Sequence, residues 1–427
     1  MKRILFILSF ACICEYHNII AQVREVEYYR DVEPVLRKHC YDCHFAGGPA
    51  PFDLTHAEQV KKRGSFVAYV TSIRYMPPWK ASTDFGTHRN ARVLSDEEIA
   101  VIKTWVDNGM KTGKPPKSKK KAKVTESQKP AVGTMELFMD SDYRMPSDRK
   151  DDFRFFYLPF GNTEEKYITG IEFVAGNKKR VHHSRIMVDT SGLVAGINGL
   201  SESDTAIYRY QKKPLADEFL YGWVPGNFTF RFPRGFGKKL HPNSGFLLNM
   251  HYAPSSLTET DRSGIRLTLE EAKNIKREVR TFILRENDIT NKPFVIPAET
   301  EKTFYISSGI IPIDLSLLTV QPHAHLLGKA FRAFAITPDG DLIPLIKIDK
   351  WDFNWQTTYE FPSLIHIPAG SVIYMEGTYD NTSSNPVNPN IPPVDTGYGW
   401  RTVDEMMNLI FYYTEYQSGD ENLILEY

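Results

Sequence analysis

The sequence predicts a multidomain fold, in which a small all-α domain at residues 22–113 precedes two all-β sandwiches at residues 134–277 and 278–427. The chain has 427 residues, which is too long for one ordinary core. Helix signals are confined to the first region, and a Lys- and Pro-rich segment at residues 114–133 follows it. Beyond this segment, short runs of Val, Ile, Tyr and Phe, such as those at residues 167–174 and 371–379, alternate with Gly, Pro and Asn, which predicts strands of turn-rich, jelly-roll-like β sandwiches.

The first 21 residues are predicted to be a signal peptide. A positive start, Lys2 and Arg3, precedes an apolar run that ends at Cys14 and is shorter than the roughly 20 residues of a membrane span. We expect cleavage after Ala21, with lipoprotein processing at Cys12 as the alternative. The mature protein would then be periplasmic or secreted, and no other segment is long and apolar enough to be a transmembrane segment.

Composition says little about macromolecular partners. The 52 basic and 52 acidic residues give a formal net charge of zero, so nothing indicates a nucleic-acid partner. Residues 114–133 contain seven Lys and three Pro, which favours a self-repelling, extended linker. A docking patch for an anionic partner is the alternative interpretation of its Lys run.

Helix signals lie at both ends of the first region. Asp31 is predicted to be the N-cap of a helix that continues to His39. Ser95, followed by three acidic residues, is predicted to open a second helix that ends at Gly109. The second helix carries an apolar stripe of Ile99, Ile102 and Val106.

A C-x-x-C-H motif predicts one covalent haem c. Cys40 and Cys43 are spaced to bind the two vinyl groups of a porphyrin, and His44 can reach the iron from the proximal side. A redox cysteine pair would need a βαβ setting, and a zinc site would need a second pair of ligands. The sequence around the motif has no βαβ pattern. It also has no second cysteine pair, because the two other cysteines, Cys12 and Cys14, lie in the predicted leader.

The sixth iron ligand is predicted to be Met76, which is followed by Pro77 and Pro78. His56 and His88 are the alternatives, and a Met that only fills a gap is a third interpretation. The haem-binding motif, the Met-Pro-Pro-Trp loop and the closing helix occur in an order that resembles a small class I cytochrome c domain over residues 28–113.

Five of the twelve histidines form three groups in the β region: His182 with His183, His251 in Met-His-Tyr, and His323 with His325. Residues two apart on a strand point to the same face, so the last pair can hold one metal. Adjacent histidines share a metal only at a bulge or a strand end. Imidazole suits copper, zinc, iron and nickel, so the residues alone do not identify the metal.

The order of these motifs resembles the type II copper monooxygenases, the family of the ascorbate-dependent peptidylglycine α-hydroxylating and dopamine β-monooxygenases. The similarity covers residues 134–427 and includes a Met-Met-Asn run at 406–408. The resemblance implies two coppers. One, which transfers electrons, would be held by His182, His183 and His251. The other, which binds dioxygen, would be held by His323, His325 and Met406, with Met407 as the alternative thioether ligand.

Departures from the family bear on the substrate. The peptide-processing members have an Arg where this chain has Gln321 and a substrate-contacting Tyr where it has Ile410, whereas Asn408 is retained. The resemblance therefore predicts that a glycine-extended peptide is not the substrate and that the substrate is less anionic. The disulfides of the animal enzymes are absent too, and His241 and His366 match no family position.

The sequence therefore predicts a copper-dependent monooxygenase that hydroxylates a C–H bond of a small molecule with dioxygen. Electrons would pass through the fused haem to the copper of His182, His183 and His251, from a possible external donor. A non-catalytic exported haem and copper electron-transfer or copper-binding protein is the alternative. A sandwich-type binding or adhesion module without copper is a third hypothesis.

Overall fold

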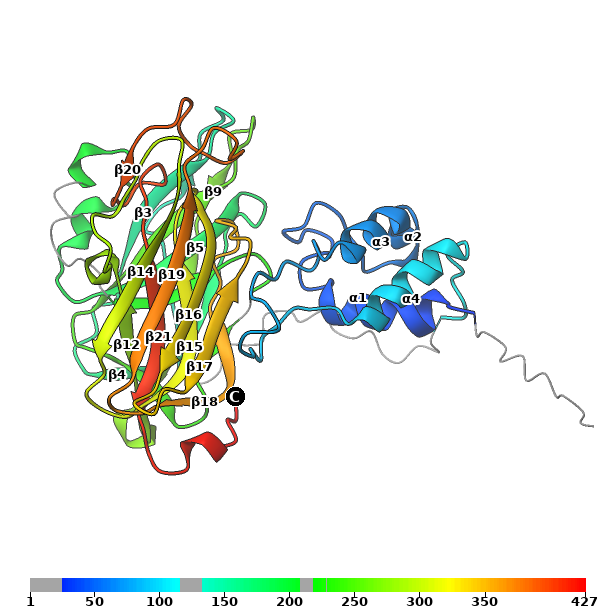
Figure 1. The fold of residues 1–427 in the computed structure, drawn as a ribbon. Helices are drawn as coiled ribbons and strands as arrows, with labels where there is room; N and C mark the ends of the chain where they lie inside the picture. The colour runs from blue at the N-terminus through cyan, green and yellow to red at the C-terminus, as the bar shows by residue number, and fades with distance from the viewer. Residues whose placement is uncertain (1–24, 116–132, 208–217, 228) are drawn as a thin grey trace, which may run out of the picture.

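The computed structural model describes residues 25–115, 133–207, 218–227 and 229–427. The predicted signal peptide and most of the predicted linker lie outside these residues. Strands make up 37% of the structure and helices 14%, so the chain is mostly β. A helical unit at the N-terminal end stands beside a larger β body (Figure 1). No helix within the described ranges has the length and apolar composition needed to cross a membrane.

The helical unit is built from short elements. In the described part of the chain these are η1 (Tyr28–Val32, a π-helical turn), α1 (Glu33–His39), α2 (Ala57–Lys61), α3 (Gly64–Ser72) and α4 (Asp96–Asp107).

The prediction for α4 is confirmed, whereas the predicted N-cap of the first helix is wrong. Ser95 Oγ accepts from the N–H of Glu98 at 3.1 Å, and the Glu98 carboxylate accepts from the N–H of Ser95 at 2.9 Å. Asp31 lies inside η1, and its carboxylate accepts from the N–H of Glu27 at 2.8 Å. It therefore closes the preceding turn instead of capping α1.

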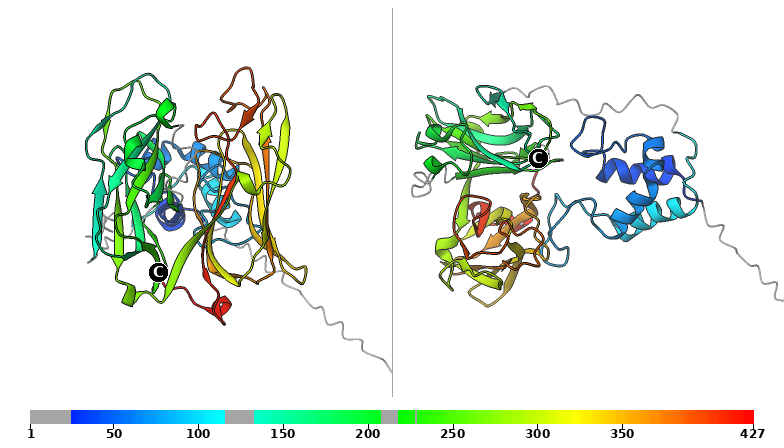
Figure 2. Two further views of the ribbon diagram at one scale, coloured as in Figure 1. Left: turned by 90° about the vertical axis from the view of Figure 1, so that its left-hand side faces the viewer. Right: turned by 90° about the horizontal axis from the view of Figure 1, so that it is seen from above.

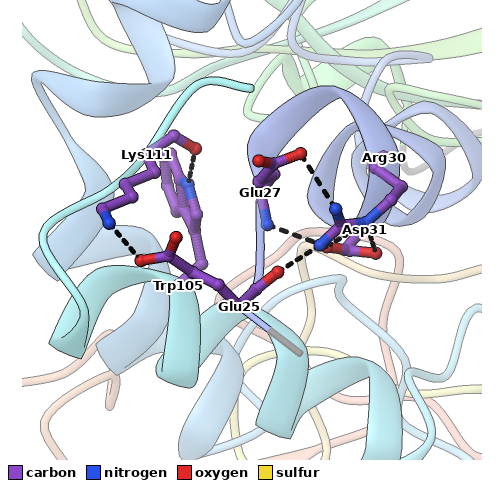
Figure 3. Close-up of polar contacts among 6 residues, drawn as sticks. All are labelled: Glu25, Glu27, Arg30, Asp31, Trp105 and Lys111. Atoms are coloured by element: carbon purple, nitrogen blue, oxygen red, sulfur yellow. Dashed lines mark hydrogen bonds and ion pairs between the residues drawn. The ribbon is translucent and has the colours of Figure 1, made fainter. Parts of the chain in front are cut away.

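Polar contacts fasten the start of the helical unit to the end of α4 (Figure 3). The indole Nε1 of Trp105 donates to the carbonyl of Lys111 at 2.9 Å, and the ammonium group of Lys111 pairs with Glu25. Arg30 pairs with Glu27 at 2.9 Å one turn away. Because the Trp105 ring is buried in the helical core, this contact anchors both chain segments.

The predicted fold class, a small all-α cytochrome c domain ahead of two β sandwiches, is wrong at its N-terminal end. The helices are short, the longest having 12 residues, and the connection between α3 and α4 leaves the helical unit. Ala81 is buried in the core of the β body and forms a β-bridge with Ile348, and Trp79 packs against the same core. Residues 22–113 are therefore not a self-contained all-α domain, because part of them is buried in the β structure.

The N-terminal sandwich has two layers. One is a four-stranded sheet in the order β3-β9-β5-β6, and the other is one half of a nine-stranded sheet. The strands of the first layer are β3 (Asp152–Pro159), β9 (Gly245–Tyr252), β5 (Val181–Asp189) and β6 (Glu218–Trp223). The strands of the second are β1 (Thr134–Phe138), β11 (Gly264–Glu270), β4 (Lys166–Val174), β7 (Phe230–Arg231) and β8 (Phe236–Leu240).

The C-terminal sandwich repeats this arrangement, with a four-stranded sheet in the order β14-β19-β16-β17. Its strands are β14 (Glu301–Ile310), β19 (Val372–Asp380), β16 (Gly328–Ile336) and β17 (Leu342–Ile348). The facing strands are β12 (Arg277–Leu284), β21 (Asn408–Glu415), β15 (Leu315–His323) and β18 (Tyr359–Ile367). Two small sheets pair β2 (Tyr143–Arg144) with β10 (Thr260–Asp261) and β13 (Val295–Ile296) with β20 (Thr396–Gly397).

Strand β12 joins the two sandwiches. It pairs in parallel with β8 and antiparallel with β21, so one sheet runs through both units in the order β1-β11-β4-β8-β12-β21-β15-β18. The predicted break between residues 277 and 278 falls at the start of this strand. Figure 2 shows the two sandwiches side by side. The strands predicted at residues 167–174 and 371–379 are confirmed as β4 and β19.

Candidate metal centres

The first cluster consists of His182, His183 and His251. One ligand nitrogen from each residue lies within 4.8 Å of the others. The Nδ1 atoms of His183 and His251 are 3.2 Å apart, and the Nδ1 of His182 is enclosed without a hydrogen-bond partner among the residues that the structure describes. Three imidazole nitrogens that converge in this way can hold one metal ion.

A β-bulge produces this convergence. His182 and His183 lie inside β5, where the register with β9 shifts between Val181 and His183. His183 stands directly opposite His251 across the two strands. The bulge is the irregularity that adjacent histidines need in order to turn toward one site.

Burial keeps His182 and His183 neutral. It lowers the pKa of His182 to about 4 and also lowers the pKa of His183. Neutral imidazole is the form that binds a metal. Asp151 accepts from Nε2 of His251 at 2.6 Å, and this hydrogen bond lowers the pKa of the Asp151 carboxyl group. The carboxylate therefore fixes the ring so that Nδ1 faces the cluster.

The second cluster is the pair His323 and His325, and Met406 is its predicted third ligand. His323 ends β15 and His325 follows it, and their ring centroids are 5.2 Å apart. The Nδ1 of His323 bonds to the side-chain oxygen of Gln356, and the Nδ1 of His325 bonds to the carbonyl of Asp404 at 3.0 Å. Both rings therefore donate through Nδ1 and have Nε2 as the nitrogen available to a metal.

The two histidines of the second cluster are also neutral. Burial lowers the pKa of His325 to about 4 and that of His323 well below its ordinary value. Each ring is at most 5% exposed. Their protonation state therefore suits a metal ligand at neutral pH.

Met406 and Met407 occupy different environments. Met407 is buried in the core of the C-terminal sandwich, where its methyl group packs close to Gly377. Met406 is only half-buried, and its carbonyl accepts from the hydroxyl of Tyr379 at 2.8 Å. The core therefore holds the side chain of Met407, whereas that of Met406 lies outside it.

Glu405 ties the segments of the second cluster together. Its carboxylate accepts from the N–H groups of His325 at 2.9 Å, Leu327 at 2.6 Å and Met406 at 3.1 Å. Burial raises the pKa of Glu405 to about 8, although these N–H groups act in the opposite direction. One carboxylate thus fixes the backbone of two of the three predicted ligands.

Phe353 and Arg185 lie between the two clusters. The centroid of the Phe353 ring is 5.1 Å from that of His183 and 6.0 Å from that of His325. The guanidinium of Arg185, on β5, has Nη1 2.9 Å from Nε2 of His323. The N-terminal sandwich therefore contacts the second cluster directly.

The predicted substrate residues are engaged within the protein. Gln321 is buried, and its side-chain oxygen accepts from Thr358 Oγ1 at 2.7 Å. Asn408 stands opposite His323 across the sheet and donates to Glu286 at 2.9 Å. Ile410, also buried, pairs with Gln321 across the same strands.

The C-x-x-C-H motif lies just after α1, at the side of the helical unit that faces the N-terminal sandwich. Cys40 and Cys43 are free thiols, and burial raises the pKa of Cys40 to about 12 and also raises that of Cys43. His44 Nδ1 bonds to the carbonyl of Phe52 at 3.0 Å. A Cβ at Gly226 would overlap the Cys43 sulfur, so this glycine lies directly against the motif.

The candidate sixth ligands lie apart from one another. Met76 is half-buried, and its N–H donates to Val70 at 3.1 Å. His88 has left the helical unit: its Nε2 lies 3.2 Å from the carbonyl of Leu345, and its ring stacks on Phe361. His56 is exposed.

The two histidines that match no family position, His241 and His366, lie outside both clusters. His366 pairs with Asp314 at 3.0 Å and stacks on Tyr416. His241 is exposed in the turn between β8 and β9.

Sequence reasoning missed several residues of these centres. Asp151, Gln356 and Glu405 orient the predicted ligands, and Arg185 contacts one of them. Two signals were available, because Glu405 directly precedes Met406 and Arg185 lies two residues after His183 on the same strand. Asp151 and Gln356 carry no such signal, since tertiary contacts alone bring them to the histidines.

Comparisons with known proteins agree with this geometry. Residues 288–421 match a family model described as "Copper type II ascorbate-dependent monooxygenase, C-terminal domain". A human protein named "Putative DBH-like monooxygenase protein 2" is 26% identical over 284 residues, which are 61% of this chain and 52% of that protein. The chain thus spans about half the length of this relative. These matches support a copper type II monooxygenase-like function and imply copper as the metal.

Solved structures give only distant similarities. The major capsid protein P2 of bacteriophage PM2 has a TM-score of 0.29 and 7% identity, covering 67% of this chain and 99% of that chain. The VP2 subviral particle of infectious bursal disease virus has a TM-score of 0.18 and 8% identity, and the match covers 69% of this chain and 74% of that chain. Scores this low support no argument about fold or function.

Proposed function

We propose that the chain is a copper-dependent monooxygenase that hydroxylates a C–H bond of a small molecule with dioxygen. The observation that carries this proposal is the presence of two clusters of buried or half-buried histidines, one on each sandwich, joined through Phe353 and Arg185. One cluster would exchange electrons, and the other would be the place where dioxygen and substrate meet.

The donor sets fit copper. His182, His183 and His251 offer three nitrogens, one of which is enclosed and has no partner among the described residues. His323 and His325 offer Nε2, and Met406 would add a soft thioether, which favours Cu(I). Bound copper would supply one-electron redox chemistry at both clusters.

The protein residues around the clusters hold the ligands and limit water. Three acceptors fix the orientation of the imidazole rings. Asp151 accepts a hydrogen bond from a ring N–H of His251, Gln356 accepts one from His323, and the carbonyl of Asp404 accepts one from His325. Phe353 fills the space between His183 and His325 with an apolar ring, which restricts solvent there. None of these roles requires a histidine ligand to gain or lose a proton.

We propose in addition that Cys40 and Cys43 bind one haem covalently, with His44 as iron ligand. The hydrogen bond from His44 Nδ1 to Phe52 supports this, because it makes Nε2 available to iron. One face of α3 carries Phe66, Tyr69 and, just beyond it, Ile73, all more than half exposed. Phe66 packs against Phe52, which contacts His44. This unpartnered apolar face suits a flat hydrophobic group.

The proposed haem would supply electrons within the same chain. Cys43 lies against Gly226 of the N-terminal sandwich, and Arg92 of the helical region donates to the carbonyl of Gly226 at 2.7 Å. Such contacts favour electron transfer inside one molecule over a diffusible reductant at high concentration. Export to the periplasm or the medium belongs to this proposal, since covalent haem attachment and the predicted leader both point to it.

Copper content and oxygen uptake test the proposed function together. Metal analysis of the purified protein should give two coppers per chain, and His325→Ala and His182→Ala should each remove one. Reductant-dependent oxygen uptake should disappear in the His325→Ala variant. Two coppers without oxygen uptake under any substrate or reductant would favour the electron-transfer or copper-binding alternative. A chain without copper would exclude the oxygenase.

A further inference from the structure

Arg185 is a charged side chain at the centre of the two clusters. It lies two residues after His183 on β5, so both side chains point to the face of the strand that meets the C-terminal sandwich. Its Nη1 contacts His323 Nε2 at 2.9 Å, and its Nε is enclosed without a partner. A guanidinium has five N–H donors, and here only one has an acceptor in the described part of the chain.

No carboxylate of the described residues lies within the 4.0 Å of an ion pair with Arg185. Glu286 is the carboxylate that acts most strongly on it, but one oxygen of Glu286 already accepts from the N–H of Met407 and the amide of Asn408. The guanidinium of an arginine stays protonated in proteins, so Arg185 carries its positive charge at neutral pH.

A metal at the second cluster would also remove the one acceptor that Arg185 has. Nε2 of His323 is the nitrogen left for the metal, because Nδ1 is bound to Gln356. It is the same nitrogen that Arg185 contacts. Arg185 is half-buried with its Nε enclosed, so the loss of this acceptor is unfavourable unless another acceptor replaces it.

We propose that Arg185 is a specificity-determining residue that binds a carboxylate group of the substrate beside the second cluster. A guanidinium fork matches a carboxylate in shape and charge. This assignment rests on the proposed function and deepens it by naming a substrate class. It also reverses the expectation of a less anionic substrate, since the buried Gln321 and Ile410 are not the groups that decide the charge.

Matched pairs of probes test the assignment. Copper-loaded protein is titrated calorimetrically with hexanoate and 3-phenylpropionate, and with hexanamide and 3-phenylpropanamide, which have nearly the same shape without the charge. The chain offers a control in Arg332, an exposed arginine on β16 that has its own partner, Glu376, at 2.9 Å. The variants are Arg185→Gln, Arg185→Lys and Arg332→Gln.

The carboxylates should bind about 10- to 100-fold more tightly than the amides, as a charge-assisted pair predicts. Arg332→Gln should keep this preference, Arg185→Lys should reduce it several-fold, and Arg185→Gln should abolish it. If Arg185→Gln does not fold, Arg185→Lys still decides the outcome, because it keeps the charge but not the fork. Carboxylates that fail to bind, amides that bind equally well, or a preference unchanged in the Arg185 variants would overturn the assignment. A chain without copper that keeps the preference would contradict the proposed function alone.

Discussion

The N–H of His325 donates a 2.9 Å hydrogen bond to the carboxylate of Glu405, and this carboxylate also accepts from the N–H of Met406. Replacing Glu405 by Gln removes one acceptor oxygen and adds two donors among groups that already donate. We expect copper affinity of the second cluster to fall about 10- to 100-fold, with the first cluster unaffected. Competitive titration with a copper chelator measures this, and an equal loss at both clusters would contradict it.

Adjacent methionines should respond differently to truncation. Met407→Ala removes a buried side chain and should lower the free energy of unfolding by about 2–5 kcal/mol with both coppers retained. Met406→Ala should unfold at nearly the wild-type denaturant concentration but lose the sulfur signal from the copper X-ray absorption spectrum. If Met407→Ala loses that signal instead, then Met407 is the copper ligand and Met406 is not.

Asp151 is predicted to tune the first cluster through His251, which it contacts at 2.6 Å. Asp151→Asn keeps the size of the side chain but removes its charge, so the imidazole becomes a weaker donor to a metal. Copper affinity of the first cluster should fall about tenfold or more, while that of the second is unchanged. The matched control is Asp314→Asn, because Asp314 pairs in the same way with His366, which lies outside both clusters.

The buried pair of Arg277 and Asp420 should stabilise the fold in a pH-dependent way. Two 2.7 Å hydrogen bonds join them, and Ser316 donates a third to Asp420. Desolvation raises the pKa of Asp420, but these partners outweigh it and lower the pKa to about 2. Because the folded pKa lies below the unfolded value, the stabilisation is complete above about pH 4 and is lost as the pH falls toward 2.

Asp420→Asn should therefore cost about 3 kcal/mol at pH 7, since it leaves the Arg277 charge buried and unpaired. Urea unfolding at pH 7 and at low pH measures the difference, which should shrink at low pH. Glu376→Gln is the control, because its pair with Arg332 is exposed and worth less than about 1 kcal/mol. Equal effects of the two substitutions would refute the prediction.

The proposed haem should remain with the polypeptide through acid–acetone extraction. Changing both Cys40 and Cys43 to Ala should release it, because the thioether bonds are then absent. His44→Ala should retain attached porphyrin but change the iron spectrum. Haem that extracts freely from the unmodified protein would contradict covalent attachment. Met76→Ala, with His88→Ala beside it, tests which residue is the sixth ligand.

Local patterns in the sequence predicted individual elements well. The capping residues at Ser95 and the alternation at residues 167–174 depend on neighbours in the chain, and both elements are confirmed. The self-contained helical domain was wrong because Trp79 and Ala81 are buried by partners more than 200 residues away. These residues lie in the connection between α3 and α4, which has no hydrophobic periodicity, so its sequence gives no signal of such packing.

The histidines of the candidate centres were found from the sequence, but their arrangement was not. The bulge between Val181 and His183 depends on pairing with β9, which no local pattern encodes. The charge of Arg185 was visible, but its position against His323 depends on how two sandwiches meet. Both features require the tertiary structure.

The shared strand β12 also limits how the two halves of the β body can move. A hinge that separates the sandwiches would have to break the ladder between β12 and either β8 or β21. Twisting a continuous sheet costs less free energy than breaking its strand pairing. Relative motion of the two clusters should therefore be a small twist of the sheet. Backbone amides in Arg277–Leu284 should consequently exchange with deuterium only when the whole body unfolds, and cutting the chain there should yield two fragments that must reassociate to regain either core.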